Sequence, residues 1–171
     1  CAHYNVHIVR NVHNVHNVHK CAMCTLCTLN TMYTMGTLLR HGSIEQKDHF
    51  LPTIASGELR LQAFGVTEPT TGTDTTSLKT TARKDGDNYV VNGQKVWTSR
   101  IEHSDFMLLL ARTAGRDSGK KPHDGMSVFL VDIRGLIGKS LTIKPIKTMM
   151  NHATTELFFK DMPVPKENLS L

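Results

Sequence analysis

One short segment contains most of the side chains that could contact a cofactor. Residues 67–74 read Thr-Glu-Pro-Thr-Thr-Gly-Thr-Asp. Pro69 fixes one backbone angle and favours an extended conformation at Glu68, whereas Gly72 permits close approach of a ligand to the backbone. The threonine hydroxyls can both donate and accept hydrogen bonds. Such a loop could surround the polar edge of a cofactor and its phosphates, although the same composition is typical of an ordinary surface turn.

The segment also contains two carboxylates, Glu68 and Asp74, which are candidates for acid–base catalysis. Nothing in the sequence indicates that they converge. Two carboxylates six residues apart on a loop more often cap a helix or form a salt bridge. We therefore expect structural roles for both.

The single tryptophan, Trp97, is followed by two hydroxyl side chains, Thr98 and Ser99. An indole can pack on a planar ring system, and the adjacent hydroxyls could bond the heteroatoms of such a ring. A tryptophan buried in the core of a strand is the alternative, and residue type alone favours it.

The N-terminal stretch contains all the cysteines of the chain, and two overlapping C-x-x-C pairs span residues 21–27. A tandem Asn-Val-His triplet over residues 11–19 precedes them. One interpretation is a zinc or iron–sulfur site. The other is coincidence within a repeat, which we favour because no later cysteine could complete a cluster. No metal ligand is assigned.

The chain divides into parts of different character. Residues 1–35 contain no Asp or Glu and repeat with a period of three, which fits neither a helix nor a strand, so they are interpreted as low-complexity sequence. The sequence of residues 36–60 is typical of the end of a helical region. Within them, Ser43 and Gln46 have the spacing of a capping box, and Gly57 is a stop signal.

Residues 61–165 have the pattern of β-structure. Apolar and polar residues alternate over residues 78–83, as in a half-buried strand. Asp85-Gly86 predicts a turn, and Asn92-Gly93 predicts a second one. Further strands are predicted at residues 89–92, 107–111, 126–133 and 154–159. Pro163 and Pro165 are expected to end the sheet. The predicted fold class is mainly β, as a sandwich or barrel.

Composition limits the possible classes of protein. The 171 residues are 39% hydrophobic, enough for one core, and the net charge is +5. The basic residues are scattered, so nucleic-acid binding is not predicted. No stretch approaches the roughly 20 apolar residues of a membrane span, and no signal-peptide pattern is present. The clustered cysteines do not resemble a disulfide framework, which favours an intracellular, soluble protein.

Residues 64–74 resemble the signature of the acyl-CoA dehydrogenase family, in which Thr-Glu-Pro is followed by small residues and Gly-Ser-Asp. Several motifs in one order are more specific than a single motif. The resemblance continues through residues 87–97, 105–113, 126–132, 151–159 and 164–169. It identifies residues 61–171 with the middle domain of that family and residues 36–60 with the end of its N-terminal helical domain.

The resemblance implies a small β-barrel, preceded by a short helical segment, with FAD bound against it. In this family Thr67 would hydrogen-bond the flavin ring, Trp97 would cover one face, and Ser99 would contact the reactive nitrogen. Thr73 would also approach the bound substrate. Thr71 departs from the usual Ala or Gly of the family and adds bulk, which disfavours close backbone contact there. The full set implied to bind the cofactor is Phe64, Val66, Thr67, Gly72, Thr73, Trp97, Thr98 and Ser99.

The activity implied by the resemblance is FAD-dependent α,β-dehydrogenation of an acyl-CoA thioester. In the family, a carboxylate of the C-terminal helical domain takes the α-proton and the flavin takes the hydride. The chain ends where that domain would begin, so no catalytic residue is assigned and little or no activity is expected from this chain alone.

The resemblance also implies partners and a location. These are an acyl-CoA substrate, an electron-transfer flavoprotein or similar acceptor, and further copies of the chain. The location would be the cytoplasm in a bacterium or the mitochondrial matrix in a eukaryote. Two alternatives remain. One is a non-catalytic flavin- or partner-binding β-module, and the other is a metal-binding N-terminal peptide fused to a β-scaffold.

Overall fold

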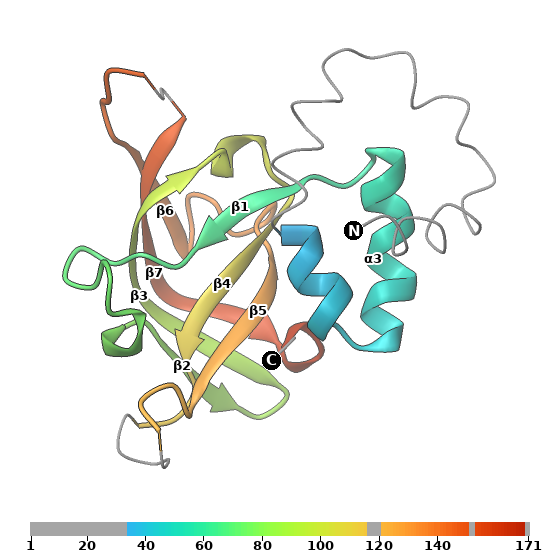
Figure 1. Ribbon diagram of the computed structural model, residues 1–171, viewed down its shortest axis with the longest axis horizontal. Coiled ribbons are helices and arrows are strands. Elements are labelled where there is room, and N and C mark those ends of the chain that lie inside the picture. The colour runs from blue at the N-terminus through green and yellow to red at the C-terminus, as the bar shows by residue number, and fades with distance from the viewer. Residues whose placement is uncertain (1–33, 116–120, 151–152, 170–171) are drawn as a thin grey trace.

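The computed structural model describes residues 34–115, 121–150 and 153–169. Two short helical segments, residues 34–41 and α3 (Ile44–Ser56), precede a seven-stranded sheet (Figure 1). The strands are β1 (Leu61–Gly65), β2 (Thr81–Asp85), β3 (Asn88–Ser99), β4 (Phe106–Arg112), β5 (Met126–Asp132), β6 (Leu141–Pro145) and β7 (Thr154–Pro165). Within these ranges, no helix has the length and apolar character needed to cross a bilayer.

The strands form one curled sheet in the order β1-β4-β2-β3-β7-β6, with β5 paired to β4 outside this path. The long strands β3 and β7 form an antiparallel ladder. By contrast, β1 runs parallel to β4. The curl encloses a common interior and has the form of a half-barrel (Figure 1). The predicted mainly β fold class is therefore confirmed.

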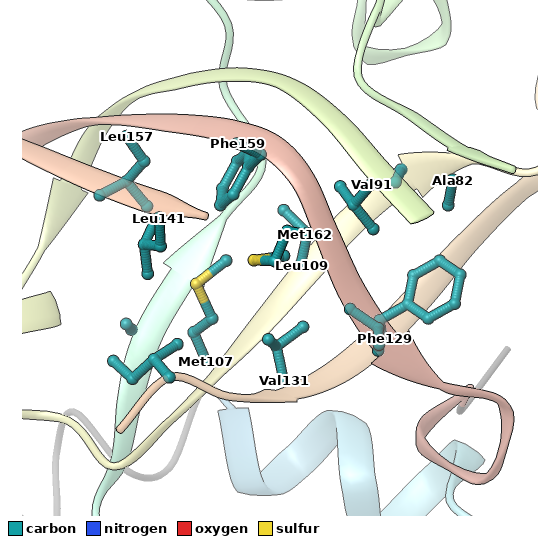
Figure 2. Packing of buried hydrophobic residues seen from close by; sticks show 14 of the residues in the cluster. Ala82, Val91, Met107, Leu109, Phe129, Val131, Leu141, Leu157, Phe159 and Met162 are labelled. Carbon is teal, nitrogen blue, oxygen red and sulfur yellow. The ribbon is translucent and has the colours of Figure 1, made fainter. Parts of the chain in front are cut away.

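Apolar side chains from all seven strands fill the interior of the curl (Figure 2). Met107 and Leu109 of β4 point into this core, whereas Phe106 and Leu108 pack on the other face against the helical segments. Strand β4 is thus covered on both faces. This explains why its sequence is a continuous apolar run without alternation, and it confirms the buried strand predicted there.

Helix α3 begins and ends at the predicted residues. The Ser43 hydroxyl accepts the Gln46 N–H, and the Gln46 side chain accepts the Ser43 N–H, both at 3.1 Å. Gly57 ends the helix in the left-handed region at φ 82°. The Gln46 amide also donates to the Glu167 carbonyl oxygen at 2.6 Å, which ties the helix to the end of the β-domain.

Two predictions about strand ends were wrong. Asn92-Gly93 is not a turn, because β3 continues through it with a shift in its pairing to β7 after Val91. Pro163 does not end the sheet, since it lies inside β7 opposite Val90 of β3, whereas Pro165 is the last residue of β7 as predicted. The β6 ladder on the other side of β7 stops at Phe159. Beyond that point β7 is an edge, where proline is tolerated.

The short strands β1 and β6 were not individually predicted. Each has five residues, and β1 is buried at four of its five positions with no clear alternation. The boundaries of the three sequence domains, 1–35, 36–60 and 61–171, stay a prediction.

Candidate functional site

The structure brings the two halves of the predicted cofactor site together. The chain leaves β1 after Gly65 and passes beside β3, where the Val96 N–H donates to the Thr67 carbonyl oxygen at 2.8 Å. Each of these segments exposes a large aromatic side chain, Phe64 at 47% and Trp97 at 58%. The two motifs, about 30 residues apart in sequence, are therefore adjacent in the folded chain.

Trp97 is turned outward by an irregularity in its own strand. Its φ angle is 63°, in the left-handed region that bulky residues rarely adopt. The pairing between β3 and β7 shifts between Lys95 and Thr98, as in a bulge that redirects a side chain. Lys95 and Thr98 are both buried, at 0% and 1%. The alternative of a buried core tryptophan is therefore wrong.

The other predicted cofactor residues differ in their exposure. Gly72 and Thr73 are exposed on the loop, and Val66, Thr67 and Ser99 are half-buried. Thr98 lies in the interior, and its hydroxyl oxygen has no hydrogen-bond partner among the described residues. Ser99 is therefore better placed than Thr98 to contact a ligand at the surface. The assignment of this set to FAD stays a prediction.

The salt-bridge partner of Glu68 is Lys95, and neither this partner nor the burial of the pair was predicted. The Lys95 ammonium group lies 2.9 Å from the Glu68 carboxylate, and the two side chains are 0% and 4% exposed. Glu68 also accepts the backbone N–H groups of Lys79 at 2.6 Å and Thr80 at 2.9 Å. The signal that could have revealed the pair is the two-residue period of β3, which places Lys95 on the same inward side as Val91.

The surroundings of this ion pair determine its protonation. Burial alone would raise the pKa of Glu68, but hydrogen bonds from Lys79, Thr80 and Lys95 outweigh burial and leave the pKa below its ordinary value. Burial lowers the pKa of Lys95, and the hydrogen bond and charge of Glu68 oppose this effect. Glu68 is thus an ionised, fully engaged structural group and is unsuited to take a proton from a substrate.

Asp74 is also structural. Its carboxylate accepts the Thr76 N–H at 3.1 Å and caps the short helix η2 (Thr75–Ser77). It bonds the hydroxyls of Thr76 and Ser77 as well. The prediction that Glu68 and Asp74 serve as salt-bridge and cap groups is confirmed.

Comparison with known proteins agrees with this geometry. The profile "Acyl-CoA dehydrogenase, middle domain" matches residues 63–162. This chain belongs to the acyl-CoA dehydrogenase family. The matched range includes the loop that begins after β1, the Trp97 bulge and most of the ladder of β3 with β7. The family is one of flavoprotein oxidoreductases.

Individual acyl-CoA dehydrogenases are similar in sequence and fold. FadE26 of Mycobacterium tuberculosis is 42% identical over 132 residues, which cover 77% of this chain and 32% of that protein. The crystal structure of an acyl-CoA dehydrogenase from Geobacillus kaustophilus matches with a TM-score of 0.70 at 34% identity, over 80% of this chain and 35% of that one. A glutaryl-coenzyme A dehydrogenase in complex with glutaryl-CoA matches with a TM-score of 0.72 at 30% identity, over 82% and 34%. This chain therefore spans about a third of the length of these relatives.

The residues predicted to bind the cofactor do not line the depression of about 420 Å³ that the loop forms with neighbouring residues. The depression is lined by Glu68, Pro69, Thr70, Lys79, Thr80, Gly93, Gln94 and Phe158. Phe64 and Trp97 thus belong to an exposed face, and this face would form one wall of a site.

The metal interpretation of the N-terminal stretch is not tested by the structure. Within residues 34–115, 121–150 and 153–169, no cluster of three or more His, Cys, Asp or Glu side chains could hold a metal ion. The cysteines and the Asn-Val-His triplets lie outside the described residues.

Proposed function

We propose that this chain forms one wall of the FAD site of an acyl-CoA dehydrogenase that acts on an acyl-CoA thioester. The observation that carries the proposal is the pair of exposed aromatic side chains, Phe64 and Trp97, on two segments joined by the hydrogen bond from Val96 to Thr67. Exposed planar apolar groups of this size fit a ligand with a planar ring. Membership of the acyl-CoA dehydrogenase family, whose members are flavoproteins, supports a flavin as that ring.

The residues of this face have distinct roles in the proposal. Trp97 and Phe64 cover the ring and exclude water from it. Thr67 and Ser99 present hydroxyls to its polar edge. Gly72 has no atom within 4 Å of the place where a Cβ would lie, so the ligand can come close to the loop backbone there. When bound, FAD supplies the acceptor for the hydride that leaves the substrate.

The group that accepts the α-proton is proposed to lie outside these 171 residues. Glu68 is buried in an ion pair and Asp74 caps η2, so neither carboxylate of the loop is available as a base. We therefore expect little or no dehydrogenase activity from these 171 residues alone. The complete enzyme would pass its electrons to an electron-transfer flavoprotein or a similar acceptor, and it would assemble from several copies.

Trp97 itself reports on the proposed site because it is the only tryptophan. FAD is titrated into the 171-residue chain and the emission of Trp97 is recorded, with free N-acetyltryptophanamide correcting for absorption by the flavin. Saturable quenching by FAD and by riboflavin, but not by ADP, is the expected result. Unchanged emission over the whole titration, in protein whose circular dichroism shows the folded sheet, would contradict the proposal.

A non-catalytic flavin-binding module is the second candidate, and the engaged state of Glu68 and Asp74 favours it. Adding a saturated acyl-CoA to the FAD-loaded chain without oxygen should leave the visible flavin absorbance unchanged in both cases, and its loss would show dehydrogenation by this chain alone. The same reaction in a chimera that replaces the matched segment of FadE26 with this chain distinguishes the two candidates. Loss of the flavin absorbance in the chimera would support the wall of an active site, and a stable flavin spectrum would support the module.

A further inference from the structure

Lys95 connects backbone segments that lie far apart in sequence. Its ammonium group donates to the Val66 carbonyl oxygen and to the Glu68 carboxylate, both at 2.9 Å. Glu68 then accepts the backbone N–H groups of Lys79 and Thr80. One buried point therefore joins strand β3, the loop at residues 66–68 and the residues that lead into β2.

Stability alone does not account for charged groups at this position. Both side chains are almost fully buried, and removing two charges from water has a large desolvation cost that a well-packed apolar pair would avoid. Charged hydrogen bonds require a particular direction and length, whereas apolar contacts do not. The pair can therefore specify how the loop lies on β3, which apolar packing would leave less defined.

The aliphatic part of Lys95 is also held in place. It passes Gly65, where an added Cβ would lie 3.6 Å from the Lys95 Cγ atom and 3.2 Å from a Leu109 methyl group. A side chain at residue 65 would crowd this space. Because Lys95 is also fully buried, its side chain has little freedom to place the ammonium group elsewhere.

The segments that carry Phe64 and Trp97 are both connected to the ion pair of Glu68 and Lys95. Val66 and Glu68, which contact Lys95, flank Thr67, whose carbonyl oxygen accepts the Val96 N–H at 2.8 Å. The bulge that exposes Trp97 begins directly after Lys95. A change at the ion pair is thus transmitted to both sides of the surface through one or two residues.

We propose that Glu68 and Lys95 are positioning residues that hold the loop at Thr67 against the Trp97 bulge, so that the flavin-binding face is formed before the cofactor arrives. Neither residue needs to touch the cofactor in this role. The inference rests on the proposed flavin function for its purpose, but the positioning itself can be measured without FAD.

The test uses Lys95→Met and the double variant Glu68→Gln/Lys95→Met in the 171-residue chain. Amide hydrogen exchange is followed at Val96, with Val91 of the same strand as internal reference. In both variants we expect Val96 to exchange about tenfold faster relative to Val91, because a local opening no longer has to break the ion pair. FAD affinity should fall by about tenfold in both, because the face is no longer preorganised.

Val131→Ala is the matched control, because Val131 is a buried core residue of β5. This variant should lower the stability of the whole sheet and leave the ratio of Val96 to Val91 exchange unchanged. The double variant should recover part of the stability lost in Lys95→Met without recovering the protection of Val96. That separation distinguishes positioning from a general contribution to folding.

Two results separate the positioning role from the flavin function. A ratio of exchange rates in Lys95→Met equal to that in Val131→Ala, with unchanged FAD affinity, would overturn the positioning role and leave the flavin function standing. A raised exchange ratio in Lys95→Met, combined with a wild-type protein that binds no FAD, would support the positioning of the loop and remove the flavin function from this chain.

Discussion

Gly93 passes so close to Thr80 that a Cβ atom on Gly93 would lie 2.5 Å from the Thr80 hydroxyl oxygen and 2.7 Å from its Cα atom. The φ angle of Gly93 is 151°, which other residues rarely adopt. Thr80 in turn donates its backbone N–H to Glu68 at 2.9 Å. The glycine therefore permits the close crossing on which the hydrogen bonds of the buried carboxylate depend.

Gly93→Ala should destabilise the protein by about 2–4 kcal/mol, because a Cβ atom meets backbone as well as a side chain and the φ angle becomes strained. Urea denaturation followed by circular dichroism measures this change. Gly115→Ala is the matched control, since nothing lies within 4 Å of a Cβ at that position. Equal stability of the two variants would contradict the close crossing.

Lys95→Met should lower the free energy of unfolding by about 3–5 kcal/mol, because it leaves the buried Glu68 carboxylate without its counter-charge. The double variant Glu68→Gln/Lys95→Met should be more stable than Lys95→Met, since no uncompensated charge remains. Denaturant unfolding of Lys95→Met, Glu68→Gln and the double variant gives the coupling free energy. Lys166→Met, which removes the exposed ion pair with Asp87, should leave stability unchanged. Similar losses in Lys95→Met and Lys166→Met would argue against a buried pair.

Trp97→Leu should weaken FAD binding by about tenfold while changing stability by less than about 0.5 kcal/mol, because the indole is exposed and contributes little to the core. Equilibrium dialysis with FAD measures the affinity, and thermal unfolding measures the stability. Ile137→Ala, also an exposed apolar residue but remote from the loop in sequence, should retain the affinity of the wild type. A large loss of stability in Trp97→Leu would instead indicate a structural role.

Acid should destabilise the junction between α3 and β1 through Asp105. The hydrogen bonds from Arg60 hold the pKa of Asp105 below its ordinary value, and burial opposes them only in part. A carboxyl group with a lowered pKa in the folded state contributes stability that is fully present above its unfolded pKa of about 3.9. That contribution is lost as the pH falls through the folded pKa.

Stability should therefore decrease less steeply below about pH 4 in Asp105→Asn than in the wild type. Urea midpoints between neutral and acidic pH measure both slopes. In Arg60→Met, the pKa of Asp105 should rise towards its ordinary value, which carboxyl chemical shifts report directly. Parallel slopes for wild type and Asp105→Asn would show that the pair makes no pH-dependent contribution.

Features with a local physical cause followed from the sequence. The capping box of Ser43 and Gln46 depends on a three-residue spacing, and the turn at Gly86 depends on a residue that tolerates positive φ. The burial of β4 was evident from its unbroken apolar run. The acyl-CoA dehydrogenase resemblance of residues 64–74 was readable for the same reason, since the motif is contiguous.

The tertiary structure alone decided which residues meet across the sheet. Glu68 and Lys95 are 27 residues apart, and no local pattern pairs them. The sequence around Trp97 is compatible with a buried strand and with an exposed face. Only the shifted pairing of β3 with β7 turns the Trp97 side chain outward. Pro163 is accepted within a strand because the β6 ladder has ended beside it. Each outcome depends on the neighbour that lies opposite in the folded sheet, and this information is distributed over the whole chain.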